Sequence, residues 1–204
     1  MAIDLSIIGS GGHAAVVLDC LSSSKDDFTI SVFDEINFSS ELAFGLYEIK
    51  MLNDYSALND VFHAAIGSNE VRSRISMAAI GCNKKALKVV HKSSVVANGV
   101  VIEDGVFVAA NAIVAINSKI KSGCIINHGA IVDHDCHVGE YSHVGPNSTI
   151  GGSVTIGKQC LIGAGSVILP NLSVGDFCVI GAGSVVIKDV PPGTKVVGNP
   201  AREI

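Results

Sequence analysis

The sequence predicts a small α/β domain with a parallel sheet, followed by a parallel β-helix and a short tail. Strand-like and helix-like segments alternate over residues 1–91, a pattern typical of parallel α/β sheets. From Val96 to Val186, every sixth residue is Val or Ile, which is the hexapeptide period of a parallel β-helix. The period ends where Pro192 replaces the expected aliphatic residue. We therefore expect domains at 1–91 and 92–191 and a tail at 192–204.

The first domain is expected to contain four strands and two helices. Apolar runs predict strands at 3–8, 28–33, 62–66 and 86–91, and helices are expected at 13–21 and at about 70–80. Asn69 stands where a side-chain cap would begin the second helix. Residues 36–60 show no clear periodicity, so we expect them to be irregular.

The β-helix is expected to place its branched residues inside a triangular coil of ~18 residues, so that residues 96–191 form a little over five coils. The position four residues after each branched residue is small in most repeats and is never charged. This second inward position is occupied in four repeats by cysteine, namely Cys124, Cys136, Cys160 and Cys178. We therefore expect buried free thiols rather than disulfides.

Composition narrows the class of partner and the compartment. The net charge is −5 and Lys and Arg form no cluster, which disfavours a nucleic-acid partner. No segment reaches the ~18 consecutive apolar residues of a membrane span. The first residues lead directly into a strand-like run rather than into a secretory signal. We expect a reducing, cytoplasmic protein without a membrane partner.

A glycine-rich turn joins the first expected strand to the first expected helix. Residues 9–14 read Gly-Ser-Gly-Gly-His-Ala, which fits G-x-G-x-x-A. In such turns, backbone N–H groups and the helix N-terminus bind phosphate oxygens. Asp34 ends the second strand, where an acidic group would meet a ribose hydroxyl. The domain is too short for a dinucleotide fold, so we expect a mononucleotide or a nucleotide-sugar. A plain tight turn is the alternative.

Four of the seven histidines lie within a stretch of sixteen residues, at His128, His134, His137 and His143. A metal site, a general base and a solvated surface are the possible interpretations. Side chains in a triangular coil stack only at separations of 18, and no pair of these histidines has that separation. One chain therefore cannot easily gather three of them around a metal. Neighbouring subunits could do so, but we expect no metal site.

His134 stands between Asp133 and Asp135. A carboxylate bound to one ring nitrogen fixes the tautomer and stabilises the imidazolium, so this pattern is typical of a general base. Because neighbours on a strand face opposite ways, Asp135 can reach His134 only at a corner or from another subunit. Asp133 is the alternative partner. His128 and His137 are expected to be merely exposed.

At these residues the chain resembles the hexapeptide acyltransferases, most closely their bacterial nucleotide-sugar branch. That branch contains UDP-4-amino-sugar (bacillosamine-type) N-acetyltransferases, GDP-perosamine N-acetyltransferases and sialic-acid O-acetyltransferases. The resemblance extends over essentially the whole chain. Its motifs are IGSGGH at 8–13, AIGSN at 65–69, NHGAIVDHDC at 127–136, YSHV at 141–144, VILP at 167–170 and GNPA at 198–201.

The resemblance implies a left-handed β-helix behind a small Rossmann-like domain, assembled as a homotrimer. It implies that His134 is the general base, Asp135 its acidic partner and Asn127 a polar residue of the active site. The implied acetyl-CoA contacts are His143 and the backbone of Ala164 and Ala182. The implied nucleotide-sugar contacts are Gly11, Gly12, His13, Asp34, Glu35 and Gly67.

We therefore expect an acetyl-CoA-dependent N-acetyltransferase that acts on the amine of a nucleotide-linked sugar, with a UDP-4-amino-4,6-dideoxy sugar as the expected form. His134 would remove a proton as the amine attacks the thioester, without an acyl-enzyme. His134 and His143 are nine residues apart and cannot stack in one chain, so we expect the site to form between subunits. The alternatives are O-acetylation of a sialic acid or another sugar, N-acetylation of GDP-perosamine, and a non-catalytic β-helix binding module.

Overall fold

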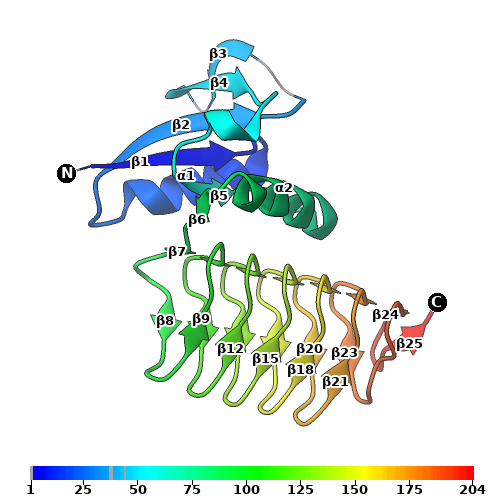
Figure 1. Cartoon of the computed structure of the whole chain (residues 1–204). Helices are drawn as coiled ribbons and strands as arrows, with labels where there is room; N and C mark the ends of the chain where they lie inside the picture. The colour runs from blue at the N-terminus through cyan, green and yellow to red at the C-terminus, as the bar shows by residue number, and fades with distance from the viewer. Residues whose placement is uncertain (1, 37–38, 44) are drawn as a thin grey trace.

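The computed structural model describes residues 2–36, 39–43 and 45–204 and contains the expected α/β domain followed by a β-helix (Figure 1). The α/β domain lies over one side of the β-helix, and the C-terminus lies at the far end of the coil (Figure 1). Neither described helix is long and apolar enough to cross a bilayer.

The first domain is built on a parallel sheet with β1 (Ile3–Ile8) at its centre. β2 (Phe28–Asp34) and β5 (Val61–Ala64) pair with β1 on either side, in parallel. α1 (Gly12–Ser22) follows β1, and α2 (Asn69–Gly81) follows β5. The first three expected strands and both expected helices are therefore present, with small shifts at their ends.

The described residues of the stretch 36–60 form regular secondary structure, contrary to the expectation that this stretch is irregular. β3 (Ser39–Ala43) and β4 (Tyr47–Met51) form an antiparallel hairpin, and η1 (Tyr55–Ala57) is a 3-10 helix. β4 also pairs in parallel with β2, so the hairpin extends the sheet. Ile49 is the only buried residue of β4, so the strand lacks the apolar pattern that would predict it. Positions 37, 38 and 44 of the expected irregular stretch lie outside the described residues.

The cap of α2 differs from the expectation by one residue. Ser68 is the N-cap, and its Oγ accepts a hydrogen bond from the N–H of Val71 at 3.4 Å. The side chain of Asn69 is engaged elsewhere, because its amide donates to Cys160 O at 2.9 Å. The residue expected to cap the helix therefore connects the two domains.

The β-helix begins earlier than expected. The strand expected at 86–91 is split into β6 (Lys85–Ala86), which pairs with β5, and β7 (Val89–Val90), which pairs with β10. The other coil strands are β8 (Val95–Val96), β9 (Val101–Ile102), β10 (Phe107–Val108), β11 (Ile113–Val114), β12 (Lys119–Ile120), β13 (Ile125–Ile126), β14 (Ile131–Val132), β15 (His137–Val138), β16 (His143–Val144), β17 (Thr149–Ile150), β18 (Thr155–Ile156), β19 (Leu161–Ile162), β20 (Val167–Ile168), β21 (Ser173–Val174), β22 (Val179–Ile180) and β23 (Val185–Val186). From β8 to β20, each strand pairs in parallel with the strand 18 residues further along, as in β13 with β16. The expected coil length is confirmed.

The coil strands form three flat faces. Face 1 contains β7, β10, β13, β16, β19 and β22 and ends with β24 (Lys195–Val197) and β25 (Arg202–Glu203). Face 2 contains β8, β11, β14, β17, β20 and β23, and face 3 contains β9, β12, β15, β18 and β21. β25 is antiparallel to β24, so the tail closes the parallel ladder of face 1 and protects its edge.

The faces meet at three edges, which are turns. Edge A lies between faces 1 and 2 and includes 127–129, 145–147, 163–165 and 181–183. Edge B lies between faces 2 and 3 and includes 115–117, 133–135 and 151–153. Edge C lies between faces 3 and 1 and includes 121–123, 139–141 and 157–159.

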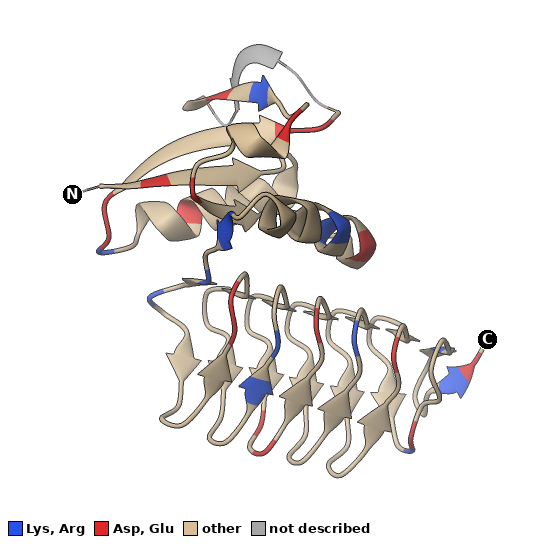
Figure 2. Ribbon diagram, in the orientation of Figure 1, with Lys and Arg blue, Asp and Glu red and all other residues tan. Residues whose placement is uncertain are grey.

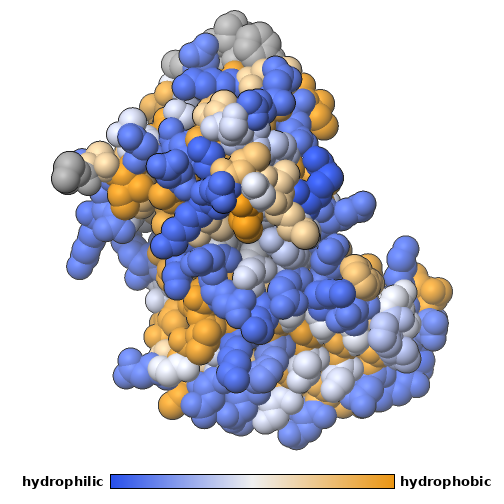
Figure 3. Space-filling view, viewed as in Figure 1, coloured by the Kyte–Doolittle hydropathy of each residue, from blue (hydrophilic) through white to orange (hydrophobic). Residues whose placement is uncertain are grey.

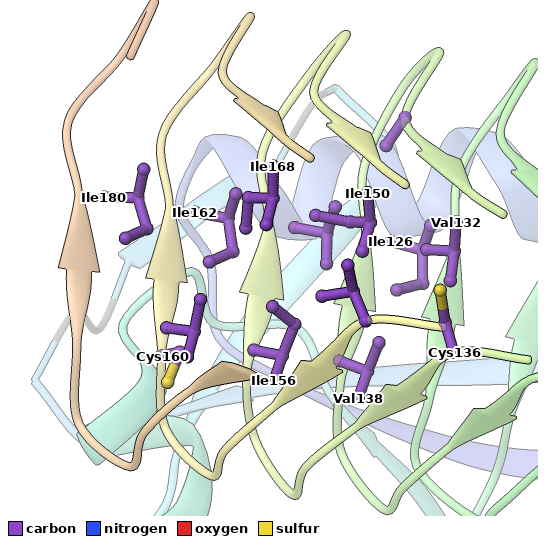
Figure 4. Close-up of a cluster of buried hydrophobic side chains, with 14 of the residues drawn as sticks. Ile126, Val132, Cys136, Val138, Ile150, Ile156, Cys160, Ile162, Ile168 and Ile180 are labelled. Carbon is purple, nitrogen blue, oxygen red and sulfur yellow. The ribbon is translucent and has the colours of Figure 1, made fainter. Parts of the chain in front are cut away.

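Stacked small and branched side chains fill the coil (Figure 4). The second residue of each strand points inward, and Ile126, Ile162 and Ile180 of face 1 are completely buried. Cys124, Cys136, Cys160 and Cys178 are also completely buried, and all are free. Burying each Val or Ile stabilises the fold by about 1.5–3 kcal/mol before opposing entropy is counted. The expectation of buried free thiols is confirmed.

The outer surfaces of the faces differ in character. On face 1, Phe107 and Ile125 are buried beneath the first domain. The outward residues of face 2 are apolar except for one Thr, and they are Val95, Ile113, Ile131, Thr149, Val167 and Val185. Those of face 3 are mostly polar, and they are Val101, Lys119, His137, Thr155 and Ser173. Apolar atoms are visible on the exposed flank of the β-helix (Figure 3), where acidic and basic residues also alternate from coil to coil (Figure 2).

Candidate active site

A cavity of about 450 Å³ lies at the carboxyl ends of β1, β2 and β5. The glycine-rich turn, Asp34, Glu35, Gly67 and one side of α2 line it. Open α/β sheets bind their ligands at this end of the strands. Every residue predicted to contact the nucleotide-sugar therefore borders the same cavity.

The glycine-rich turn leaves its backbone open to this cavity. Gly11 is the N-cap of α1 and provides no side-chain cap, so the first N–H groups of the helix are available to an anion. A Cβ added at Gly11 or Gly12 would meet no described atom within 4 Å. Gly9 has a φ of 115°, and a Cβ there would lie 2.8 Å from Ala65 O, so only glycine fits that position.

Acidic groups from the end of β2 lie on the opposite wall of the cavity. Ser10 Oγ donates to Asp34 Oδ2 at 2.7 Å. Glu35 Oε2 lies 2.6 Å from Arg74 Nη2, and Glu35 Oε1 accepts from Tyr55 Oη at 2.5 Å. The hydrogen bond from Arg74 lowers the pKa of Glu35, while burial and then Glu35 raise the pKa of Tyr55 to about 12. No sequence motif indicated Arg74 or Tyr55, because they come from helices whose spacing carries no site signal.

His134 and Asp135 form a hydrogen-bonded pair on edge B. His134 Nδ1 lies 2.8 Å from Asp135 Oδ2. Asp135 has a φ of 59°, so the chain turns a corner here and the two neighbouring side chains can meet. Asp133 instead accepts from the backbone N–H of His134 at 2.8 Å. Of the two carboxylates that the sequence left open, Asp135 is the one that contacts the imidazole.

Residues one coil away support this pair. Asn117 Nδ2 donates to Asp135 Oδ1 at 3.0 Å. A Cβ added at Gly152 would lie 2.6 Å from His134 Nε2, so the absence of a side chain there makes room for the ring. The hydrogen bond to Asp135 raises the pKa of His134, and the same bond, followed by the one from Asn117, lowers the pKa of Asp135. Asn117 is 18 residues before Asp135, and Gly152 is 18 residues after His134. The coil length of 18 could therefore have identified both supporting residues from the sequence.

His143 lies on face 1, beneath the first domain. Its Nε2 is 3.0 Å from Asn127 Nδ2. The ring centroids of His143 and His13 are 6.5 Å apart. Burial and then the charge of Arg72 lower the pKa of His143 to about 4, so its ring is neutral at pH 7. The structure therefore brings Asn127 and His143 next to the cavity of the first domain.

Ala164 and Ala182 lie on edge A, the same edge as Asn127. They are one coil apart, and the N–H of Gly183 donates to Ala164 O at 2.8 Å. Both alanines are exposed, and neither backbone N–H has a hydrogen-bond acceptor among the described residues. Edge A therefore presents two N–H groups on consecutive coils that have no acceptor among the described residues.

One chain does not gather all the predicted catalytic residues. His134 and Asp135 are on edge B, whereas Asn127 and His143 are at edge A and on face 1. The width of face 2 separates the two groups. The other clustered histidines, His128 and His137, are exposed. Within the described part of the chain, His, Cys, Asp and Glu form no group of three or more that could hold a metal ion.

Both parts of the chain match known families. Residues 4–79 match the family described as the PglD N-terminal domain, and residues 117–152 and 153–188 match the bacterial transferase hexapeptide family of six repeats. A search of curated protein sequences found no match.

Solved structures match over nearly the whole length. The acetyltransferase domain of PglB from Neisseria gonorrhoeae is 30% identical with a TM-score of 0.94, and the match covers 98% of this chain and 99% of that one. The same domain is known in complex with acetyl coenzyme A. A mutant perosamine N-acetyltransferase from Caulobacter crescentus, in complex with CoA and GDP-perosamine, is 29% identical with a TM-score of 0.92 over 98% of this chain and 96% of that one. WeeI from Acinetobacter baumannii is 25% identical with a TM-score of 0.90 over 100% of both chains.

The hexapeptide period, the two-part fold and these full-length matches agree with one another. The likeness covers the cavity of the first domain as well as the coil, since the matched ranges include both. The chain belongs to the hexapeptide acetyltransferase family and is an acyltransferase.

Proposed function

We propose that the chain transfers an acetyl group from acetyl-CoA to the amine of a nucleotide-linked sugar. The observation that carries this proposal is the position of His143 beside the nucleotide cavity, with its ring centroid 6.5 Å from that of His13, which lines the cavity. The bare backbone of the cavity suits a diphosphate. The free N–H groups of Ala164 and Ala182 suit the amide and carbonyl oxygens of acetyl-CoA. A relative with CoA and GDP-perosamine bound supports the same pairing of ligands.

The substrate form that we propose is a UDP-linked 4-amino-4,6-dideoxy sugar. Its diphosphate would lie on the N–H groups at Gly11 and Gly12, and its ribose near Asp34. Glu35 and Gly67 would border the same ligand, because both line the cavity. The sugar would then extend toward His143, which lies next to His13 at the border of the cavity. The motif at 127–136 supports this choice, since it resembles that of the UDP-4-amino-sugar enzymes.

The proposed reaction is direct attack of the amine on the thioester. The neutral sugar amine adds to the thioester carbonyl carbon, and His134 Nε2 accepts the proton that the nitrogen loses. Asp135 stabilises the resulting imidazolium through Nδ1. A backbone N–H stabilises the oxyanion, the C–S bond breaks, and the proton passes to the thiolate of coenzyme A. A free cysteine is not required as nucleophile, and the four coil cysteines are buried.

We propose that the site is completed in a homotrimer. Face 2 supports this, because its outward apolar row would otherwise remain in water. Edge A, with Asn127, borders face 2 on one side, and edge B, with His134, borders it on the other. Around a threefold axis next to face 2, edge B of one subunit would meet edge A of the next. His134 would then lie across from His143 of the adjacent chain.

The experiment that tests this function is a panel of acceptors incubated with acetyl-CoA. UDP- and GDP-linked 4-amino sugars, a free amino sugar and a sialic acid are compared by release of coenzyme A and by mass spectrometry of the product. We expect acetylation of the UDP-linked amine, as an amide that survives mild base. Transfer only to the sialic acid would favour O-acetylation. Binding of both ligands without turnover of any acceptor would favour a non-catalytic module.

A further inference from the structure

Arg72 is a buried cation at the boundary between the two domains. It extends from α2, and only 1% of its surface is exposed. Nε donates to Gly123 O at 2.7 Å and Nη2 to Tyr141 O at 2.8 Å, on consecutive coils of edge C. Nη1 donates to Ile66 O at 2.9 Å and to Gly67 O at 3.1 Å. One side chain therefore binds two coils of the β-helix and the loop that lines the nucleotide cavity.

The guanidinium of Arg72 uses all its N–H donors in hydrogen bonds, and none of its partners carries a negative charge. An arginine has five N–H groups, and the remaining bond runs from Nη2 to Asn69 Oδ1 at 2.8 Å. All its acceptors are neutral oxygens, and none of the ion pairs among the described residues includes Arg72. A buried cation without a carboxylate loses its hydration with little Coulombic compensation. Such a cost indicates a role beyond filling space.

Arg72 also holds the backbone next to His143, because Tyr141 O, which accepts from its Nη2 at 2.8 Å, lies two residues before that histidine. The amide nitrogen of Asn127 faces Nε2 of His143 at 3.0 Å, and Asn127 Oδ1 accepts from the N–H of His128 at 2.8 Å. The amide nitrogen can donate to Nε2 only if that ring nitrogen is unprotonated. This bond assigns the proton of the neutral ring to Nδ1.

We propose that Arg72 is a positioning residue for acyl transfer, which holds the Gly67 loop against two coils and thereby fixes the orientation and tautomer of His143. The inference rests on the proposed function, in which His143 borders acetyl-CoA. Asn69 reinforces the same connection, because its amide donates to Cys160 O on the next coil. Losing the connection would let the nucleotide cavity and edge A shift relative to each other. A shift of ~1 Å in a positioned group can lower a rate by about 10²-fold.

Nitrogen NMR of histidine-labelled protein without ligands tests the tautomer directly. Wild-type His143 is expected to be neutral at pH 7 and protonated on Nδ1 alone. Arg72→Met fills a similar space without donors and is expected to give mixed tautomers. Arg72→Lys is expected to do the same, because one ammonium cannot bind the loop and both coils at once. An unchanged Nδ1 tautomer in Arg72→Met would overturn the proposal.

The acetylation assay tests the consequence for turnover. Arg72→Met and Arg72→Lys are expected to lower kcat by about 10- to 100-fold, with a smaller change in KM. Ala79→Gly is the matched control, since it weakens the same helix at a buried position and changes neither Arg72 nor any of its hydrogen-bond acceptors. It is expected to keep both kcat and the His143 tautomer. An equal loss of kcat in Ala79→Gly would assign the effect to helix stability and contradict the proposal.

A milder variant covers the case in which the Arg72 variants do not fold. Asn69→Ala removes one acceptor of Arg72 and the contact with Cys160, and it leaves the cation in place. Mixed tautomers of His143 and a lower kcat are expected. Unchanged values of both would count against the positioning role. Because the NMR measurement uses no substrate, a protein that acetylates no sugar but loses the tautomer in Arg72→Met would refute the proposed function while upholding the control of His143 by Arg72.

Discussion

His134 carries the proton transfer in the proposed reaction, and its side chain is 53% exposed on edge B. His134→Ala is expected to lower kcat by about 10²–10⁴-fold, the usual cost of losing a general base. Binding of acetyl-CoA, measured by calorimetry, is expected to persist, because edge A is unchanged. His137→Ala is the matched control, since it removes another exposed imidazole from the same coil. Near-normal turnover of His134→Ala at neutral pH would exclude the role.

The pH profile reports the pairing of His134 with Asp135. The hydrogen bond to Asp135, and then the charge of Asp133, hold the pKa of His134 above its ordinary 6.5. A base acts when it is neutral, so kcat/KM is expected to rise with pH through this raised pKa. Asp135→Asn removes the charge that favours the imidazolium, so the pKa falls and the rise moves to lower pH, with a lower plateau. A profile that stays in place or moves to higher pH would contradict the pairing.

A substitution at Gly152 is expected to displace the imidazole ring of His134 without disturbing the coil. In Gly152→Ala the new methyl group would lie 2.6 Å from His134 Nε2, the far end of a side chain that can move. The expected result is a lower kcat with little change in melting temperature, because the ring leaves its place while the coil stays intact. Gly81→Ala is the control, since a Cβ there would meet no described atom within 4 Å. A variant with full activity would show that the ring does not need this space.

At single residues, the sequence could predict the chemistry but only part of the geometry. The acidic neighbours of His134 predicted a base, yet strand alternation could not choose between Asp133 and Asp135. The choice depends on the φ of 59° at Asp135, a conformation that Asp tolerates better than most residues. Arg72 gave no signal either, because its acceptors are backbone carbonyls of distant coils.

At the scale of the elements, the burial of the coil cysteines tests the register. Cys124, Cys136, Cys160 and Cys178 are expected to resist thiol reagents in the native protein, because burial leaves no access and raises the pKa of Cys124 to about 12. Cys82 is exposed and is expected to react at once, so it serves as the internal control. Mass spectrometry after a short pulse distinguishes them. Labelling of all four coil cysteines before unfolding would contradict the register.

Elements with a strict period or a continuous apolar run could be predicted from the sequence, and those with neither could not. The six-residue period places the coil strands from β8 to β23 correctly. The hairpin β3–β4 was missed because only Ile49 of β4 is buried. β7 was merged with β6 because one apolar stretch supplies both, although one extends the first sheet and the other begins the coil.

At the scale of the whole molecule, the residues of the proposed site lie in two separate groups within one chain. The nucleotide cavity, His143 and edge A form one group, and the His134–Asp135 pair on edge B forms the other. The sequence spacing indicated this separation, because His134 and His143 do not occur one coil apart. The contact of the first domain with face 1, which brings His13 to His143, could not be predicted from either domain alone.

Complementation between defective chains tests the shared site most directly. His134→Ala and His143→Ala chains are produced separately and together, and acetyl transfer to the nucleotide-sugar is measured in each preparation. Each variant alone is expected to be nearly inactive. When equal amounts of the two chains assemble at random, about a quarter of all interfaces would pair an intact His134 with an intact His143 from the adjacent chain, so about a quarter of the wild-type activity is expected to return. A stable trimer of mixed chains that remains inactive would contradict a site built between subunits.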